Sequence, residues 1–437
     1  MLRYMIRKEY FGAYVYDSKE RMYLLFDWDS FEIFENIKND IQYYDRLSDD
    51  VKKILQEEEF MLGGQINFYI VNNGICEEGV LSAPMRLHLL YTNTCNLNCI
   101  HCFSKTLSER KQNEMTFDDK VKILDEMKKI GICEILIGGG EPFVKDDIYD
   151  FIFECNKRDI VVKIFTNGLL FAKGNFDKIL NADIAYLAIS VDGTTNEEYA
   201  VTRGIEGLDT VKDVIKKLKR EKCRYPILVS TTINHFNCKN PQEYLDFMME
   251  TGADRLKIRA TKPNGNINEN RDVMIAPDKY LDFLVKIQSL YNLFYKNKFK
   301  LDITWGDFRL YFDEETQEIK VLPADLPYEQ YGCVAGKTAM CINADGIGTP
   351  CGFLPDDLQP GIEDNVIKKS ILEVWQQGTI FTRLRHIEGN SECINCEEYT
   401  LCRGGCIARI RFSGQEINGI DPWCIKKYFP IEVTNVC

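Results

Sequence analysis

The sequence predicts an α/β protein built from three parts, and each part has its own pattern. Between residues 85 and 262, strand-like runs alternate with helix-like segments, which is typical of a parallel sheet covered by helices. Residues 1–80 instead join short strands to amphipathic helical segments. A bridge over 263–332 leads to a cysteine-rich part at 333–437. We therefore expect an N-terminal domain, a central parallel sheet and a C-terminal domain organised by its cysteines.

The N-terminal segment has the element order of a small winged helix-turn-helix domain. Its expected elements are strands at Tyr10–Tyr16 and Arg21–Phe26, helices at Asp29–Ile37 and Val51–Glu58, and a last strand at Ile66–Val71. The helices present no basic recognition face, so DNA binding is the weaker use of such a domain. A free strand edge suits a different task, which is the capture of an extended peptide as an added strand.

Six strands are expected in the central part, with helices between them. They are Arg86–Tyr91, Ile132–Ile137, Ile160–Phe165, Ile184–Ser190, Ile227–Ile233 and Arg255–Ala260. The first connecting helix begins after Thr116, a good N-cap, and ends before Gly131, a residue that commonly follows the last helical turn. Parallel strands joined in this way bring their carboxyl ends to one edge of the sheet.

Residues able to carry chemistry follow four of these strands. In order along the chain they are Cys95, Cys99 and Cys102, then Gly138–Pro142, then Thr166–Gly168, then Ser190–Asp192. Functional residues of parallel α/β sheets gather at the carboxyl ends of strands. The recurrence at four neighbouring ends therefore predicts a single concave site.

The first of these groups, Cys95-x3-Cys99-x2-Cys102, offers three thiolates and no nearby fourth. Iron-sulfur clusters are normally held by four cysteine thiolates. A four-iron cluster bound by this loop would keep one iron open to a ligand that is not protein. We expect the chemistry of the chain at that iron.

Composition narrows the class of protein further. The chain has 437 residues, 45% hydrophobic content and a formal net charge of -13, which opposes tight binding to nucleic acid. We find neither a signal peptide nor a stretch of about 20 apolar residues that would span a membrane. The sequence predicts a cytoplasmic protein without a nucleic-acid or membrane partner. Of its 17 cysteines, those in the closely spaced groups are expected to be reduced and to bind metal, and most of the others to be ordinary buried residues.

Four motifs in residues 85–262 together resemble the core of radical SAM enzymes. They are CNLNCIHC at 95–102, GGGEP at 138–142, TNG at 166–168 and SVDG at 190–193. The resemblance implies a partial (β/α)6 barrel with a 4Fe-4S cluster whose unique iron is chelated by S-adenosylmethionine. In that family, reduction of the cluster cleaves the cofactor to methionine and a 5'-deoxyadenosyl radical, which abstracts hydrogen from the substrate.

The resemblance also assigns expected roles to individual residues. Cys95, Cys99 and Cys102 would hold the cluster, Gly139, Gly140 and Glu141 the methionine amino group, Ser190 and Asp192 the ribose, and Arg203 the methionyl carboxylate. Asn167 is either a cofactor contact or a side chain that caps its own turn. His101 is expected to pack beside the cluster without binding metal. No residue of the chain is singled out as a catalytic acid or base.

The cysteines of residues 333–437 resemble a second family template, the SPASM domain with two auxiliary clusters. By that resemblance Cys333, Cys351 and Cys406 serve the first auxiliary cluster, and Cys393, Cys396, Cys402 and Cys424 serve the second, for a total of three 4Fe-4S clusters. Cys341 is either the fourth ligand of the first auxiliary cluster or an ordinary small core residue. Structural zinc sites are the competing interpretation of these cysteines.

The N-terminal start, EYFGAYVYD at 9–17, resembles the PqqD-like precursor-recognition domain of peptide maturases, the alternative being a plain packing module. The sequence thus predicts a radical SAM/SPASM enzyme that crosslinks a ribosomal precursor peptide, with a thioether between a Cys sulfur and carbon favoured. A carbon-carbon crosslink such as the Lys-Trp link of streptide-type peptides, or formylglycine-type maturation of a folded enzyme, is the alternative. An external donor such as flavodoxin or ferredoxin would supply electrons.

Overall fold

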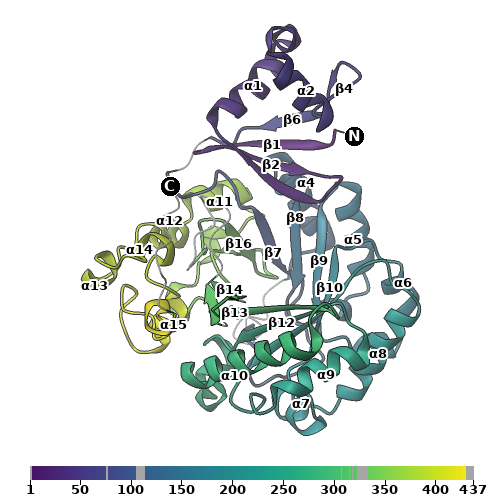
Figure 1. Cartoon of the computed structure of the whole chain (residues 1–437), viewed down its shortest axis with the longest axis vertical. Helices are drawn as coiled ribbons and strands as arrows, with labels where there is room; N and C mark the ends of the chain where they lie inside the picture. Colours follow the sequence, from purple (N-terminus) through teal and green to yellow (C-terminus); the bar gives the residue numbers. More distant parts are fainter. Residues whose placement is uncertain are drawn as a thin grey trace.

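The computed structural model describes residues 2–74, 77–104, 114–306, 308–313, 315–316, 318–321 and 333–429. Cys76 and Cys437, which fit neither cysteine template, lie outside these ranges. Figure 1 shows the N-terminal part above the central sheet and the C-terminal part beside it. Among the helices of the described ranges, none combines the length and the apolar character needed to cross a bilayer.

The N-terminal part is a four-stranded sheet with helices on one side (Figure 1). The strand order is β3-β2-β1-β6, in which β1 pairs antiparallel with β2 and parallel with β6. The elements are β1 Tyr4–Glu9, β2 Gly12–Asp17, β3 Met22–Phe26, α1 Trp28–Asn39, the 3-10 helix Ile41–Arg46, α2 Asp49–Glu57, β4 Met61–Leu62, β5 Gln65–Ile66 and β6 Phe68–Val71. Both expected helices are confirmed, and β4 with β5 forms the wing.

Strand β1 was not expected from the sequence, because its residues Arg7 and Glu9 look like surface positions. Both side chains are fully buried and form an ion pair, with Arg7 Nε 2.6 Å from a Glu9 oxygen. Arg7 also donates to the carbonyls of Pro84 and Gly131, and Glu9 accepts from the backbone N–H of Ser82. A charged strand is buried here because each charge has a partner.

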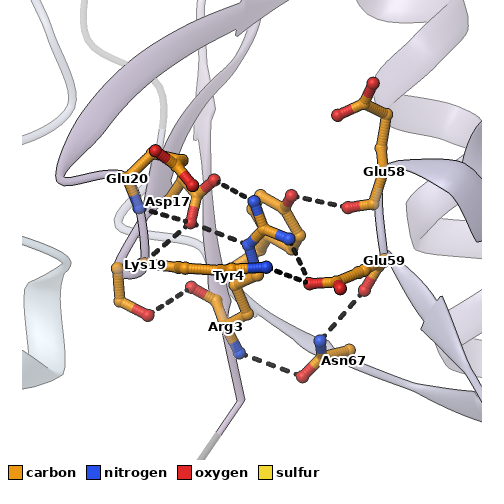
Figure 2. Close-up of polar contacts among 9 residues, drawn as sticks. Arg3, Tyr4, Asp17, Lys19, Glu20, Glu58, Glu59 and Asn67 are labelled. Atoms are coloured by element: carbon orange, nitrogen blue, oxygen red, sulfur yellow. Dashed lines mark hydrogen bonds and ion pairs between the residues drawn. The ribbon is translucent and has the colours of Figure 1, made fainter.

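A second polar network fixes the far end of the same sheet (Figure 2). Arg3 bonds both carboxylate oxygens of Asp17, at 2.9 and 2.6 Å, and pairs with Glu59. Asn67 closes the network, since its amide donates to the Glu59 carbonyl and its oxygen accepts from the Arg3 N–H. The turn after β2 and the segment after α2 are thereby tied to the start of β1.

The central sheet has eleven strands in the described part of the chain, in the order β15-β14-β13-β12-β11-β10-β9-β8-β7-β16-β17. The six expected strands are confirmed as β7 Arg86–Leu90, β8 Glu134–Gly138, β9 Val161–Thr166, β10 Tyr186–Ser190, β11 Ile227–Ile233 and β12 Arg255–Ala260, all parallel to their neighbours. The others are β13 Lys300–Trp305, β14 Phe308–Asp313, β15 Glu318–Val321, β16 Ala339–Ile342 and β17 Gly348–Thr349. The sheet therefore continues past the six strands on both sides.

Helices cover the outer face of this sheet (Figure 1). They are α4 Phe117–Ile130, α5 Ile148–Lys157, α6 Phe176–Leu180, α7 Asn196–Arg203, α8 Leu208–Arg220, α9 Pro241–Thr251 and α10 Pro277–Leu290, with a π-helix at Tyr291–Tyr295 and short 3-10 helices at Pro142–Val144, Leu169–Ala172, Gly265–Asn268 and Arg271–Val273. Helix α4 begins as expected, because Thr116 and Asp119 form a capping box. Gly131 ends it at φ 73°, a left-handed conformation that suits glycine.

The C-terminal part contains short helices and completes one edge of the central sheet. Its helices are α11 Ile371–Gln377, α12 Thr379–Arg385, α13 Ser391–Ile394, α14 Tyr399–Cys402, α15 Ile407–Phe412 and α16 Ile425–Tyr428, with 3-10 helices at Asp356–Leu358 and Ile362–Asp364. Strand β16 pairs in parallel with β7, so the cysteine-rich part shares its backbone hydrogen bonds with the barrel. The expected domain limits, 1–80, 85–262, 263–332 and 333–437, remain predictions.

The segment that connects the N-terminal part to the central part is hydrogen-bonded to the C-terminal part. The indole N–H of Trp375 donates to the carbonyl of Leu81 at 2.8 Å, and the amide of Gln376 donates to the carbonyl of Asn73 at 3.0 Å. The backbone N–H of Leu81 in turn donates to the carbonyl of Lys337. The chain that leaves the N-terminal sheet is therefore fixed against the C-terminal part.

Candidate active site

The three cysteines of the CNLNCIHC loop lie where the sequence predicts them, after the carboxyl end of β7. Cys95 is exposed, Cys99 is buried and Cys102 is half-buried. All three line a cavity of about 360 Å³ at the carboxyl ends of the strands. On one side the loop is anchored to the end of α7, because the N–H of Ile100 donates to the carbonyl of Thr202.

The same cavity is lined by most of the predicted cofactor residues. Gly139, Gly140, Glu141, Asn167, Ser190 and Arg203 all reach its wall. Asp192 does not line it, since its side chain is fully buried behind Arg203. The structure thus brings the ends of four strands together, and the roles of the individual residues stay predictions.

The glycines after β8 are required by the backbone of the cysteine loop. A Cβ on Gly139 would lie 2.5 Å from the carbonyl oxygen of Thr92, and one on Gly140 would lie 2.2 Å from that of Thr94. The N–H of Gly140 donates to the Thr92 carbonyl at 2.7 Å, and Glu141 donates similarly to Thr94. The family resemblance implies that these glycines let a cofactor approach closely, but the protein's own backbone already requires them.

The carboxylate of Glu141 is buried and fully engaged. It accepts from the hydroxyl of Thr166 and from the N–H of Asn167, both at 2.7 Å, and from the N–H of Phe143. Burial raises the pKa of Glu141 to about 7, against the opposing effect of these hydrogen bonds. This carboxylate holds the turn after β9 onto the glycine strip.

Asn167 lies at the cavity wall and also organises its own turn. Its oxygen accepts from the N–H of Leu169 at 3.0 Å, and its amide donates to the Asn96 side chain at 2.8 Å. The turn-capping alternative raised by the sequence is therefore present in the structure. The bond to Asn96 further links the turn to the cysteine loop.

Asp192 is the centre of a buried charged group that the sequence did not reveal. One of its oxygens lies 2.5 Å from Arg203 and 3.1 Å from Nε2 of His101, and the other accepts from the N–H of Thr232. Burial alone would raise the pKa of Asp192, but Arg203 and His101 outweigh it and lower that pKa to about 2. His101 thus contacts a carboxylate, in addition to lying beside the cysteines as expected.

Arg203 connects this group to the cysteine loop. Its NH1 lies 3.7 Å from the sulfur of Cys99, while its Nε is buried without a hydrogen-bond partner. Asp192 and Cys99 raise the pKa of Arg203 above its usual value in spite of burial, so the guanidinium stays charged. A charged donor at the wall of the cavity with an unused N–H fits the binding of a carboxylate group.

The side chains that line the cavity fit an iron-sulfur cluster and S-adenosylmethionine, the two groups that the sequence motifs imply. Three thiols converge at one end, which suits an iron-sulfur cluster with one open iron. Arg203 and the hydroxyl of Ser190 stand around the remaining space and offer charge and hydrogen bonds to an amino acid and a ribose, while Glu141 lines the wall with its carboxylate bonded to the protein.

Four cysteines of the C-terminal part lie together as predicted. Cys393, Cys396, Cys402 and Cys424 line one small cavity of about 30 Å³. The iron-sulfur and zinc interpretations of these cysteines both remain predictions.

Two of the cysteines assigned to the first auxiliary cluster pack against the same apolar residues. Cys333 and Cys351 pack against one apolar cluster that includes Ile407, the residue after Cys406. Cys341 lies on β16 and is buried beside Leu90 and Phe103, with its sulfur 3.8 Å from the position of a Cβ on Gly352. Burial and the neighbouring Cys351 thiol raise the pKa of Cys341. Cys341 is therefore both a core residue and a neighbour of a predicted ligand.

Comparisons with known proteins agree with this geometry. The family model of the radical SAM superfamily matches residues 89–250, and the SPASM model, an iron-sulfur cluster-binding domain, matches residues 333–398. The chain thus contains a radical SAM domain, followed by a SPASM domain. These two domains imply S-adenosylmethionine and iron-sulfur clusters as cofactors.

Individual relatives are more distant. The chain is 26% identical over 351 residues to the AdoMet-dependent heme synthase of Methanosarcina barkeri, covering 79% of this chain and 97% of the relative. It is 26% identical over 352 residues to the mycofactocin maturase MftC of Mycobacterium tuberculosis H37Rv, covering 79% and 84%. The crystal structure of SuiB from Streptococcus suis has the same fold, with a TM-score of 0.74, 16% identity and coverage of 97% of this chain and 99% of that one.

Proposed function

We propose that this enzyme binds a ribosomally made precursor peptide through its N-terminal domain and forms an intramolecular crosslink in it by radical chemistry. The observation that carries the proposal is a separate N-terminal sheet fixed to a barrel whose cavity is lined by three cysteines. Relatives give further support, because one is named a maturase and SuiB has also been crystallised bound to its precursor peptide SuiA.

Cys95, Cys99 and Cys102 would hold the cluster at the barrel. When bound, the cluster and S-adenosylmethionine supply a 5'-deoxyadenosyl radical that takes a hydrogen atom from the substrate. Arg203 would orient the methionyl carboxylate, Asp192 would hold Arg203 in place, and Ser190 would face the ribose. Glu141 fixes the turn behind the cofactor through Thr166 and Asn167, so the wall of the cavity is rigid before any ligand binds.

The N-terminal sheet offers the strand edge that a leader peptide would need. Strand β3 is at the edge of the sheet. Its residues are uncharged and mostly half-buried. Leu24 and Phe26 pack with the core under α1, whereas Tyr23 and Leu25 pack with the opposite cluster. An extended peptide added beside β3 would meet apolar side chains on both faces of the sheet.

Mass spectrometry of a short peptide encoded beside this gene, before and after anaerobic incubation with the reduced enzyme, tests the proposal. A crosslink removes two hydrogens, so a loss of about 2 Da is expected together with formation of 5'-deoxyadenosine. The same peptide without its leader segment should bind more weakly, because it lacks the strand that pairs with β3. Equal binding of the leaderless peptide, or an unchanged mass in the full precursor, would refute the assignment.

The type of crosslink depends on the first auxiliary site. An open iron there would bind a substrate thiolate and favour a thioether. The burial of Cys341 next to Cys351 gives that cluster a candidate fourth ligand, which would leave it to transfer electrons and would favour the carbon-carbon alternative. An electron donor such as ferredoxin or flavodoxin would serve either reaction.

Iron analysis separates these possibilities. Three clusters predict about twelve irons per reconstituted chain, at four per cubic cluster. Cys341→Ala should lower this number if Cys341 is a ligand and leave it unchanged if the residue only fills the core. Cys155→Ala is a matched control, because Cys155 is buried in the barrel and outside both cysteine templates. About four irons in the wild-type protein would contradict the assignment of two auxiliary clusters.

A further inference from the structure

Two cysteine segments from distant parts of the chain meet beside the cavity. Cys102 is followed directly by Phe103, and Cys351 by Gly352 and Phe353. The rings of Phe103 and Phe353 contact each other with centroids 4.6 Å apart, and both line the cavity. The N–H of Phe353 also donates to the sulfur of Cys351 at 3.4 Å. The barrel cysteine loop and the first auxiliary segment are therefore neighbours through an aromatic pair.

A short loop after β12 bonds to both segments. The backbone N–H of Asn266 donates to the carbonyl of Cys102 at 3.0 Å, and its side-chain amide donates to the carbonyl of Cys99 at 2.7 Å. The side-chain amide of Asn264 lies between the carbonyls of Gly352 and Leu354, at 3.3 and 3.2 Å. One asparagine thus serves the barrel loop and the other serves the auxiliary segment.

The residue between the two asparagines must be glycine. Gly265 has φ +61°, and a Cβ on it would lie 2.2 Å from the carbonyl oxygen of Cys102 and 2.7 Å from that of Phe103. All three loop residues are buried, with exposed fractions of 4% for both asparagines. From the sequence, residues 263–332 are expected only to form a bridge, because no local pattern indicates that this loop meets the cysteines.

We propose that residues 264–266 form a clasp that fixes the barrel cysteine loop relative to the first auxiliary cysteine site. The clasp is a positioning element, because it bonds backbone carbonyls and none of the sulfurs. Those carbonyls belong to Cys99 and Cys102 on one side and to Gly352 and Leu354, which follow Cys351, on the other. The two asparagines of the clasp are joined by Gly265, which packs directly against the backbone of the barrel loop. A disturbance on one side therefore reaches the other. The proposal rests on the proposed function only in treating these cysteines as ligands of two clusters.

Site-resolved alkylation of the full-length, iron-loaded protein tests the clasp. N-ethylmaleimide is added, and modification of Cys99, Cys351 and Cys223 is followed by mass spectrometry. Asn264→Ala removes the bonds to the auxiliary segment and the bond from the N–H of Gly265 within the clasp, and none to the barrel loop. Asn266→Ala removes a bond to the barrel loop and none to the auxiliary segment. Each variant is expected to raise alkylation of both Cys99 and Cys351 about fivefold, the factor that corresponds to one buried hydrogen bond. Cys223, a half-buried cysteine outside both cysteine templates, is the internal reference.

Asn268→Ala is the matched control, since Asn268 is exposed on the same loop. Gly265→Ala should give the largest increase at both cysteines. If it does not fold, the two asparagine variants still decide the matter. An increase confined to the altered side, or none, overturns the clasp, because a local hydrogen bond would act only on its own segment.

The reduction potential of the barrel cluster gives a second readout in the same variants. It should shift in Asn264→Ala, although that residue contacts only the auxiliary segment, and should stay at the wild-type value in Asn268→Ala. An unshifted potential in Asn264→Ala also counts against the clasp. Iron is measured in parallel, because wild-type protein without iron would refute the proposed function, whereas iron-containing protein without the cross-effect refutes the clasp alone.

Discussion

Two buried arginine-carboxylate pairs in this protein differ in what surrounds them. In the N-terminal sheet, Arg7 pairs with Glu9, and both side chains have an exposed fraction of 0%. The other bonds of Arg7 go to backbone carbonyls, and the guanidinium lies 5.2 Å from the ring centroid of Tyr14. The Nη2 of Arg7 is buried without a hydrogen-bond partner, but the pair lies away from the active-site cavity and joins the N-terminal sheet to the barrel.

At the active site, Arg203 pairs with Asp192 in a similar geometry but with different neighbours. Arg203 contacts the sulfur of Cys99, lines the cavity and keeps a buried Nε without a hydrogen-bond partner. Asp192 contacts His101, whose Nδ1 is also without a partner. Each arginine thus keeps one buried nitrogen without a hydrogen-bond partner, and the two pairs differ in their place: Arg203 lines the cavity and contacts Cys99, whereas Arg7 lies away from the cavity and bonds backbone carbonyls. A buried ion pair inside the protein supports the fold, and one at a cavity wall can also serve a ligand.

The largest effect, on the free energy of unfolding, is expected from breaking the ion pair between Arg7 and Glu9. Arg7→Met leaves the Glu9 carboxylate buried without its charge partner, so the free energy of unfolding should fall by about 3–5 kcal/mol. Chemical denaturation followed by circular dichroism measures it. Lys8→Met, at a partly exposed position of the same strand, is the control. The double variant Arg7→Met with Glu9→Leu should recover much of the loss, and a single variant as stable as the control would contradict the argument.

The active-site pair should show itself in the pH dependence of stability. The pKa of Asp192 is lowered to about 2 in the folded protein, below the ordinary value of 3.8. Its carboxylate therefore stabilises the fold above pH 4, and this contribution is lost as the pH falls from 4 to 2. The difference in unfolding free energy between wild type and Asp192→Asn should shrink by ~2 kcal/mol over that interval. A constant difference would show that Arg203 does not stabilise the charged form.

A smaller effect is expected when Arg203 is replaced by a residue that keeps the positive charge but not the planar guanidinium group. Arg203→Lys retains a cation beside Asp192 and loses the planar fork that suits a carboxylate. Binding of S-adenosylmethionine, measured by equilibrium dialysis, should weaken about tenfold, since one charge-assisted hydrogen bond contributes ~1.5 kcal/mol or more. Stability should change little. Arg220→Lys, at an exposed position, is the control, and unchanged affinity in Arg203→Lys would remove Arg203 from the cofactor site.

The sequence predicted the features that depend on local spacing. The CNLNCIHC loop, the strand-end motifs and the capping box of α4 are patterns of a few residues, and the structure brings the first two to one cavity. The six central strands were found because buried parallel strands are continuous apolar runs.

Features that depend on distant partners were missed. Strand β1 looked polar because the burial of Arg7 depends on Glu9 and on carbonyls far along the chain. The pairing of β16 with β7 and the bonds of Asn264 to Gly352 likewise join residues that are remote in sequence. No local pattern marks them, because each of these residues taken alone is typical of a surface loop or of any short strand.

The attachment of the linker has a consequence for how the enzyme would choose its target. Trp375 and Gln376 bind the carbonyls of Leu81 and Asn73, so the small sheet is not carried on a swinging arm. A peptide bound to β3 would therefore need a fixed number of residues to reach the radical in the barrel cavity. The site of modification would then be set by its distance along the peptide from the segment bound to β3. A residue inserted between the bound segment and the reacting residue would move the modification along the peptide by one position.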